Sequence, residues 1–134
     1  MFNIHKAVRD AANSMYPKKI KMEVPSNLPL SNNRCHYNAV QAVKNNLAAG
    51  ILEVVIIYKN DCTVHYVNVL PNGTCVDFTL GVMCINDDYR FIRHVSPNEY
   101  DTINKTLKNA KDKLYASTPW YIQKLIKLSG KDWC

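Results

Sequence analysis

The stretch between residues 51 and 80 most narrows what this chain can fold into, because it contains three successive β-strand patterns. Residues 51–58 are an almost continuous run of β-branched and apolar side chains, which is typical of a central strand. Residues 62–70 and 74–80 follow it after short polar turns. Strands joined by short turns pair antiparallel. We therefore expect an antiparallel sheet at the centre of the fold.

Helical patterns lie on both sides of these strands. Apolar residues recur at helical spacing over residues 3–15 and again over about 34–49. After one more alternating strand at 89–95, the pattern turns helical from Pro97, and Pro119 begins a last helix. Helices and strands that are segregated along the chain are typical of the α+β class. We predict N-terminal helices packed on a small antiparallel sheet, followed by C-terminal helices.

The composition sets the broad class of the protein. The chain has 134 residues, which fits a single domain over residues 1–134. No apolar run approaches the roughly 20 residues of a membrane span, and the N-terminus lacks the apolar core of a signal peptide, so we expect a cytoplasmic protein. The net charge of +6 would suit an anionic partner. However, the lysines are spread over several segments, which favours a solvated surface over nucleic-acid binding. The oligomeric state is left open.

The five cysteines are Cys35, Cys62, Cys75, Cys84 and Cys134. An odd and scattered set is a poor disulfide framework, and the absence of a C-x-x-C pair gives no support for a metal site. We expect four of them to be small buried hydrophobes or an incidental tail thiol, and we expect no cofactor. Only Cys35 lies in a context that indicates reactivity.

Three residues in chain order carry the strongest indication of function. Cys35 lies at the start of a predicted helix, His65 lies within the second strand, and Asp77 lies within the third. A thiolate attacks only if it is ionised or has a base beside it, and the base works best when a carboxylate orients it. Backbone N–H groups and the dipole at a helix start favour a thiolate. Cys35, His65 and Asp77 are therefore the candidate catalytic residues.

The hairpin loop decides whether the last two of these residues can meet. A two-residue turn would send the Asp77 side chain to the face opposite His65. A three-residue loop over 71–73, with Gly73 in the left-handed conformation, would instead place Asp77 opposite Val67. His65 and Asp77 then become diagonal neighbours on one face. Both registers are sterically feasible, and the catalytic hypothesis predicts the second.

The residues around Cys35 supply candidate substrate contacts. Its backbone amide is a candidate oxyanion donor, and Asn32 or Asn33 in the preceding loop could supply a second donor or cap the helix. His36 and Asn38 follow in the same helix, where they either line the cleft or face solvent, and we expect a solvent-facing position for both. Of these two, His36 is retained as a candidate substrate-binding residue.

The pattern over residues 33–80 resembles the core of transglutaminase-like cysteine enzymes, which belong to the papain-like fold group. Its most specific part is Val76-Asp77-Phe78-Thr79, after a glycine turn. The resemblance implies a papain-like fold with a nucleophilic Cys35, a general-base His65 and an orienting Asp77. It also implies a protein or peptide substrate, and activity on an amide or acyl group as a peptidase, deamidase, amidase or acyl transferase. The glutamine that papain-type enzymes place before the cysteine is absent here, so the oxyanion donor stays open.

A second hypothesis is a basic binding module without catalysis, such as a phage-encoded inhibitor of a host protein. A composition rich in Asn, Lys and Ile suits a small phage protein. The reactivity of Cys35 separates the two hypotheses.

The last predicted helix offers a second candidate surface. We expect Trp120 and Tyr121 to anchor this helix to the core. Alternatively, with Lys124, Lys127 and Lys131, they would form a face for a membrane surface or a partner.

Overall fold

A six-stranded sheet forms the centre of the computed structural model, which describes residues 4–26 and 34–129. The strand order is β1-β6-β3-β4-β5-β2. The strands are β1 (Lys19–Ile20), β2 (Met22–Glu23), β3 (Gly50–Ile57), β4 (Cys62–Val69), β5 (Cys75–Val76) and β6 (Asp88–Val95). The central hairpin of β3 and β4 pairs from Gly50 opposite Val69 to Ile57 opposite Cys62. Seven of the eight β3 residues are buried, as expected for a central strand.

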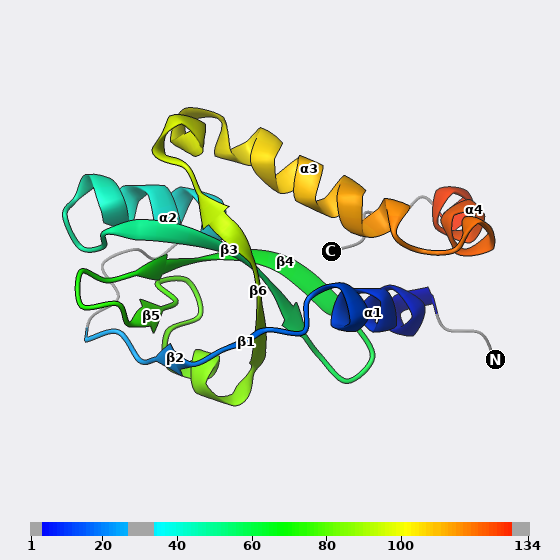
Figure 1. Cartoon of the computed structure of the whole chain (residues 1–134), viewed down its shortest axis with the longest axis horizontal. Helices are drawn as coiled ribbons and strands as arrows, with labels where there is room; N and C mark the ends of the chain where they lie inside the picture. The colour runs from blue at the N-terminus through cyan, green and yellow to red at the C-terminus, as the bar shows by residue number, and fades with distance from the viewer. Residues whose placement is uncertain (1–3, 27–33, 130–134) are drawn as a thin grey trace.

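The sheet is mixed, so the prediction of a purely antiparallel sheet is wrong. β2 pairs with β5 in parallel, whereas every other pair is antiparallel. The reason lies in residues 19–23, an almost continuous extended segment that reaches both edges of the sheet. β6 and β5, the strands with which β1 and β2 pair, run in opposite directions, so one segment must be antiparallel to β6 and parallel to β5. The sheet is thereby brought close to a barrel (Figure 1).

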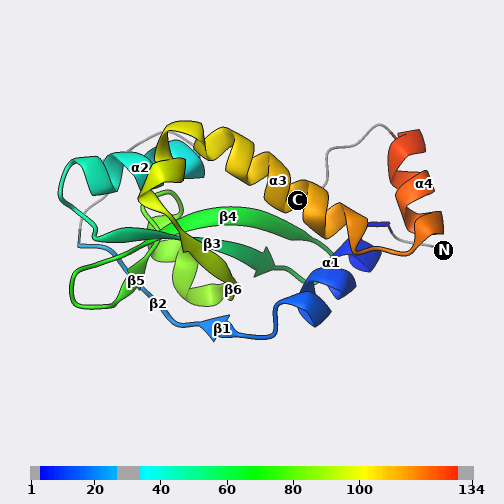
Figure 2. The same cartoon turned by 45° about the horizontal axis from the view of Figure 1, so that its top comes forward.

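Helices cover one face of the sheet, which establishes the α+β class (Figure 2). They are α1 (Ile4–Met15), α2 (Cys35–Lys44), α3 (Ile103–Ala116) and α4 (Trp120–Ser129), with 3₁₀ turns η1 (Gly81–Asn86) and η2 (Pro97–Thr102). Val8 of α1 and Leu114 of α3 pack on Val55 and Val64 of the sheet. The opposite face is closed by η1 and by Met22 of β2. Burial on both faces explains why β3 shows almost no polar alternation.

Two elements end earlier than predicted: α2 ends at Lys44 and not near residue 49, and the third predicted strand is shorter. α2 begins at Cys35 with Arg34 at the N-cap and no side-chain capping bond, and the predicted capping residues Asn32 and Asn33 lie outside the described residues. The third strand ends at Val76 and not at residue 80. The Asp77 carboxylate accepts backbone N–H groups that follow it, and such local bonds compete with a sheet ladder.

The last helix is oriented differently from the prediction. Trp120 and Tyr121 are 71% and 50% exposed, so they do not anchor α4, and the buried anchor is Ile122. Successive helical residues point about 100° apart, so only one of three neighbours faces the core. Lys124 lies over the Trp120 ring, 5.6 Å from its centroid. Lys131 and the side chain of Lys127 lie outside the described residues. In the part of the chain that the structure describes, no helix has the length and apolar character to cross a membrane.

Candidate catalytic site

The helix α2 presents Cys35 as its first residue. Ala39 and Val40, one turn further on, are buried against Ile51 and Tyr66 of the sheet, which fixes the position of the helix start. The Cys35 side chain is a half-buried free thiol. The first N–H groups of a helix have no partner within it, so the amide of Cys35 remains a candidate oxyanion donor.

The hairpin between β4 and β5 has the three-residue loop, as the catalytic hypothesis predicted. Val69 pairs with Cys75, and the N–H of Leu70 donates to the carbonyl oxygen of Thr74 at 2.8 Å. Gly73 takes a φ of 88°, the left-handed conformation that favours glycine. The alternative two-residue turn is therefore wrong.

This register brings His65 and Asp77 together inside the protein. His65 Nε2 lies 2.7 Å from Asp77 Oδ2, and the Asp77 side chain is fully buried. The hydroxyl of Tyr89 donates to the same oxygen at 2.6 Å. The N–H groups of Thr79 and Leu80 donate to Oδ1 at 2.8 and 2.9 Å. Four hydrogen bonds thus hold one buried carboxylate in a single orientation.

His65 also connects to Cys35. Burial alone would lower the pKa of His65, but its hydrogen bond to Asp77 and the influence of the nearby Cys35 side chain, with the charges of both, raise it to about 9. Because Nε2 is engaged by the carboxylate, Nδ1 is the ring nitrogen left for the thiol. The structure therefore places Cys35 at the same cleft as the hydrogen-bonded His65–Asp77 pair.

Asp77 carries the charge opposite to that of protonated His65. Burial favours its neutral form, but the hydrogen bond and charge of His65, helped by Tyr89, lower the pKa of Asp77 below its usual value. The pair is therefore an imidazolium and a carboxylate at neutral pH. A buried carboxylate in this position keeps the imidazole oriented and stabilises its protonated form.

A cleft with a volume of about 410 Å³ opens beside Cys35 and His65. Its walls come from α2, the β3–β4 hairpin, the turn after β5, and α3. They are lined by Arg34, Cys35, His36, Ile56, Tyr58, Thr63, Val64, His65, Thr79, Leu80, Leu107 and Lys111. A substrate in this cleft would lie against both the thiol and the imidazole. Over residues 4–26 and 34–129, no group of three or more His, Cys, Asp or Glu side chains is placed to hold a metal ion.

Comparisons with protein-family models, curated proteins and solved structures found no match for this chain.

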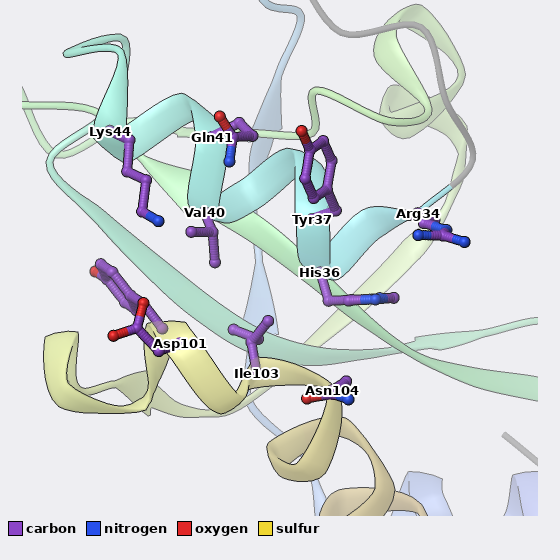
Figure 3. A pocket seen from close by; sticks show the side chains of 10 residues that line it. Arg34, His36, Tyr37, Val40, Gln41, Lys44, Asp101, Ile103 and Asn104 are labelled. Atoms are coloured by element: carbon purple, nitrogen blue, oxygen red, sulfur yellow. The ribbon is translucent and has the colours of Figure 1, made fainter.

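His36 lines the cleft, so the expectation that it faces solvent is wrong. It is half-buried, and its pKa is lowered by burial and by the charges of Arg34 and Lys111. Figure 3 shows its ring lying in the space between α2 and the start of α3, where a second hollow of about 390 Å³ is found. His36 and Arg34 thus separate two neighbouring hollows. Asn32 and Asn33, the other candidate substrate contacts, lie outside the described residues.

Two buried side chains belong to the site although the sequence did not single them out for it. Asn38 is fully buried, and its Nδ2 donates to Thr79 Oγ1 at 3.0 Å, so the solvent-facing expectation is wrong. This bond ties α2 to the turn that follows Asp77. The second buried side chain is that of Tyr89. In the sequence, only its alternation with Phe91 along a strand indicated that it points inward. Asn38 and Tyr89 each form a hydrogen bond with a residue that is distant in the sequence.

The remaining cysteines differ in state. Cys75 and Cys84 are free thiols, and burial raises the pKa of both. Cys62 is disulfide-bonded, so the expectation of a simple buried thiol is wrong there. Sequence spacing does not reveal such a bond because pairing depends on which segments the fold brings together. Cys134 lies outside the described residues.

Replacing Tyr89 with phenylalanine tests how the carboxylate is held. The Asp77–Tyr89 bond lowers the pKa of Asp77, so the stability that Asp77 contributes is present above its ordinary pKa of 3.8 and is lost as pH falls. Without the hydroxyl, the folded-state pKa of Asp77 lies closer to 3.8, so we expect a smaller loss of stability as pH falls below about 4, together with a cost of about 1–3 kcal/mol at neutral pH. Urea unfolding between pH 3 and pH 7 measures both effects. If the free energy of unfolding falls with pH in the same way in Tyr89→Phe as in the wild type, the role assigned to Tyr89 is wrong. Tyr121→Phe, on the exposed part of α4, is the control.

Proposed function

We propose that this protein is a cysteine-dependent hydrolase or acyl transferase that acts on an amide or acyl bond. The observation that supports this most is the hydrogen-bonded His65–Asp77 pair beside the Cys35 thiol at the wall of one cleft. A merely structural buried histidine needs one carboxylate partner, but it does not need a half-buried thiol beside it at a cleft. A papain-like arrangement, with the nucleophile helix packed on the sheet that carries the base, forms part of the proposal, as does a protein or peptide substrate.

The reaction follows from these positions. The Cys35 thiolate attacks the carbonyl carbon, and the resulting oxyanion accepts hydrogen bonds from backbone N–H groups at the start of α2. His65, as imidazolium, donates its proton to the leaving amine, and the C–N bond breaks to give a thioester on Cys35. Neutral His65 then takes a proton from water or an amine, which attacks the thioester. Collapse of this second intermediate releases the acyl product and the thiolate, while Asp77 stabilises the imidazolium.

The test uses p-nitrophenyl acetate, a small activated ester, on the intact chain. We expect acetylation of Cys35 with release of one equivalent of p-nitrophenolate, detected by absorbance and by mass spectrometry of the Cys35 peptide. Cys75 provides an internal comparison, because it is a free and partly exposed thiol whose pKa is raised by burial.

The matched variants are Cys35→Ala and Cys75→Ala. The first is expected to abolish the rapid release of p-nitrophenolate, and the second is expected to leave it unchanged. If Cys35 is acetylated no faster than Cys75, the proposed catalysis is wrong, and a binding role becomes the better account.

A further inference from the structure

We infer that the substrate is a polypeptide whose acyl part lies extended in a groove between α2 and α3. The inference rests on the proposed function, and it names the substrate class and the binding surface of the same site. The groove consists of the catalytic cleft and the second hollow beside it, which together extend along α2.

The two hollows are continuous along both walls. On α2, Arg34 and His36 line both of them. On α3, Asn104 lines the second hollow, whereas Leu107 and Lys111 line the catalytic cleft. These α3 residues are three and four positions apart, so they lie on one face of the helix. A single groove therefore leads from the catalytic cleft along the space between the two helices.

The second hollow is long enough for several residues of a substrate. Its α2 wall is formed by His36, Tyr37, Val40, Gln41 and Lys44, a spacing that places them on one face along the helix. From His36 to Lys44 the helix axis advances by about 12 Å. An extended chain advances about 3.3 Å per residue, so about three or four residues of a peptide would occupy this length. A small amide would fill only a part of it.

The lining of the second hollow suits a peptide main chain. Val40 and Ile103 supply a buried apolar surface. Gln41 and Asn104 add side-chain amides from opposite walls, and within the described part of the chain neither amide has a hydrogen-bond partner. A side-chain amide both donates and accepts hydrogen bonds, which matches the alternating N–H and C=O groups of an extended peptide.

Opposite charges line the far end of the second hollow. Figure 3 shows Lys44 and Asp101 at this end on opposite walls, whereas His36 lies at the end next to the catalytic cleft. A lysine and an aspartate together favour neither an anionic nor a cationic ligand. We therefore expect the bound segment to be an uncharged stretch of polypeptide.

The position of His65 decides which part of the substrate lies in the second hollow. His65 lines the catalytic cleft, whereas the described residues that line the second hollow come only from α2 with its N-cap, η2 and α3. The leaving amine takes its proton from His65, so it must lie beside that ring in the catalytic cleft. The acyl part is attached to the other side of the attacked carbonyl, and it therefore continues away from His65 into the second hollow.

Peptide chloromethyl ketones of different length test the inference without a known substrate. N-acetyl-alanine chloromethyl ketone and its tetra-alanine counterpart place a short or a long peptide on the acyl side of the carbonyl. With both, the Cys35 sulfur forms an S–C bond to the methylene carbon as the C–Cl bond breaks and chloride leaves. We expect the rate ratio of the long reagent to the short one to be at least about 10 at Cys35 and about 1 at Cys75. Mass spectrometry of the two alkylated peptides measures both ratios.

Two variants assign the length effect to the second hollow. Gln41→Ala and Asn104→Ala each remove one amide, and each is expected to lower the rate ratio at Cys35 about 3- to 10-fold, the effect of one hydrogen bond. Asn109→Ala is the matched control. Asn109 is also exposed on α3 but lines a different cavity, so its replacement is expected to leave the ratio unchanged.

The outcomes separate this inference from the proposed function. If both reagents modify Cys35 faster than Cys75 but the long reagent has no advantage at Cys35, the groove inference is overturned and the nucleophile stands. If neither reagent prefers Cys35, the proposed function fails and the inference fails with it. A raised ratio that neither Gln41→Ala nor Asn104→Ala lowers overturns the assignment of the peptide to the second hollow.

Discussion

Replacing His65 with glutamine is expected to lower the rate of Cys35 acylation by about 100- to 10,000-fold, the usual contribution of a positioned acid–base group. Glutamine retains polar atoms of similar reach but neither accepts nor releases a proton at neutral pH. The thiol then loses its proton acceptor, and a leaving amine loses its proton donor. Initial rates with p-nitrophenyl acetate and with an amide substrate measure the two losses separately.

A matched control for this variant is His94→Gln. His94 lies on β6, is exposed, and stacks edge-on against Phe91 with 5.2 Å between ring centroids. Its replacement should leave acylation unchanged. In the wild-type protein, amide cleavage should also decrease above about pH 9, because the imidazolium that protonates the leaving group is then lost. Acylation in His65→Gln at the wild-type rate would contradict the role of His65 as the base.

Local patterns in the sequence were sufficient to propose that Cys35, His65 and Asp77 lie at one site. Alternation along two strands left two registers open, and only the catalytic hypothesis selected the three-residue loop, in which His65 and Asp77 share a face as the structure shows. The helix start at Cys35 was predicted from its apolar periodicity, and packing of that stripe on the sheet confirms it. These features depend on neighbours in sequence or on a single hairpin.

The side chains that hold His65, Asp77 and the start of α2 in place could not be predicted in the same way. Tyr89 meets Asp77 because β6 lies next to β3 in the sheet. The order of strands in a sheet cannot be predicted from the alternation of residues along each strand. Asn38 meets Thr79 across 41 positions because α2 crosses the sheet near the end of β5. The parallel pairing of β2 likewise depends on how one short segment joins two edges. Such features come from the global arrangement and not from local preference.

Replacing Asp77 with alanine is expected to produce the largest loss of stability. The carboxylate accepts four hydrogen bonds in a fully buried position, and its removal leaves the His65 ring, the Tyr89 hydroxyl and two N–H groups without their acceptor. Breaking a buried ion pair by removing one partner costs about 3–5 kcal/mol. We expect a loss of this size at pH 7 in urea unfolding, whereas Asp112→Ala should change stability by less than about 1 kcal/mol, because its pair with Lys108 is exposed.

The pH dependence of this loss identifies its source. Asp77 has a lowered pKa in the folded protein, so it stabilises the fold above its ordinary pKa of 3.8 and less as pH falls. His65 has a raised pKa of about 9, so it stabilises the fold fully below its ordinary 6.5 and loses this as pH rises through about 9. The difference between wild type and Asp77→Ala should therefore be largest between about pH 4 and pH 7 and should shrink at both extremes. A difference that is constant with pH would assign the loss to packing, and would contradict an imidazolium–carboxylate pair at the centre of the site.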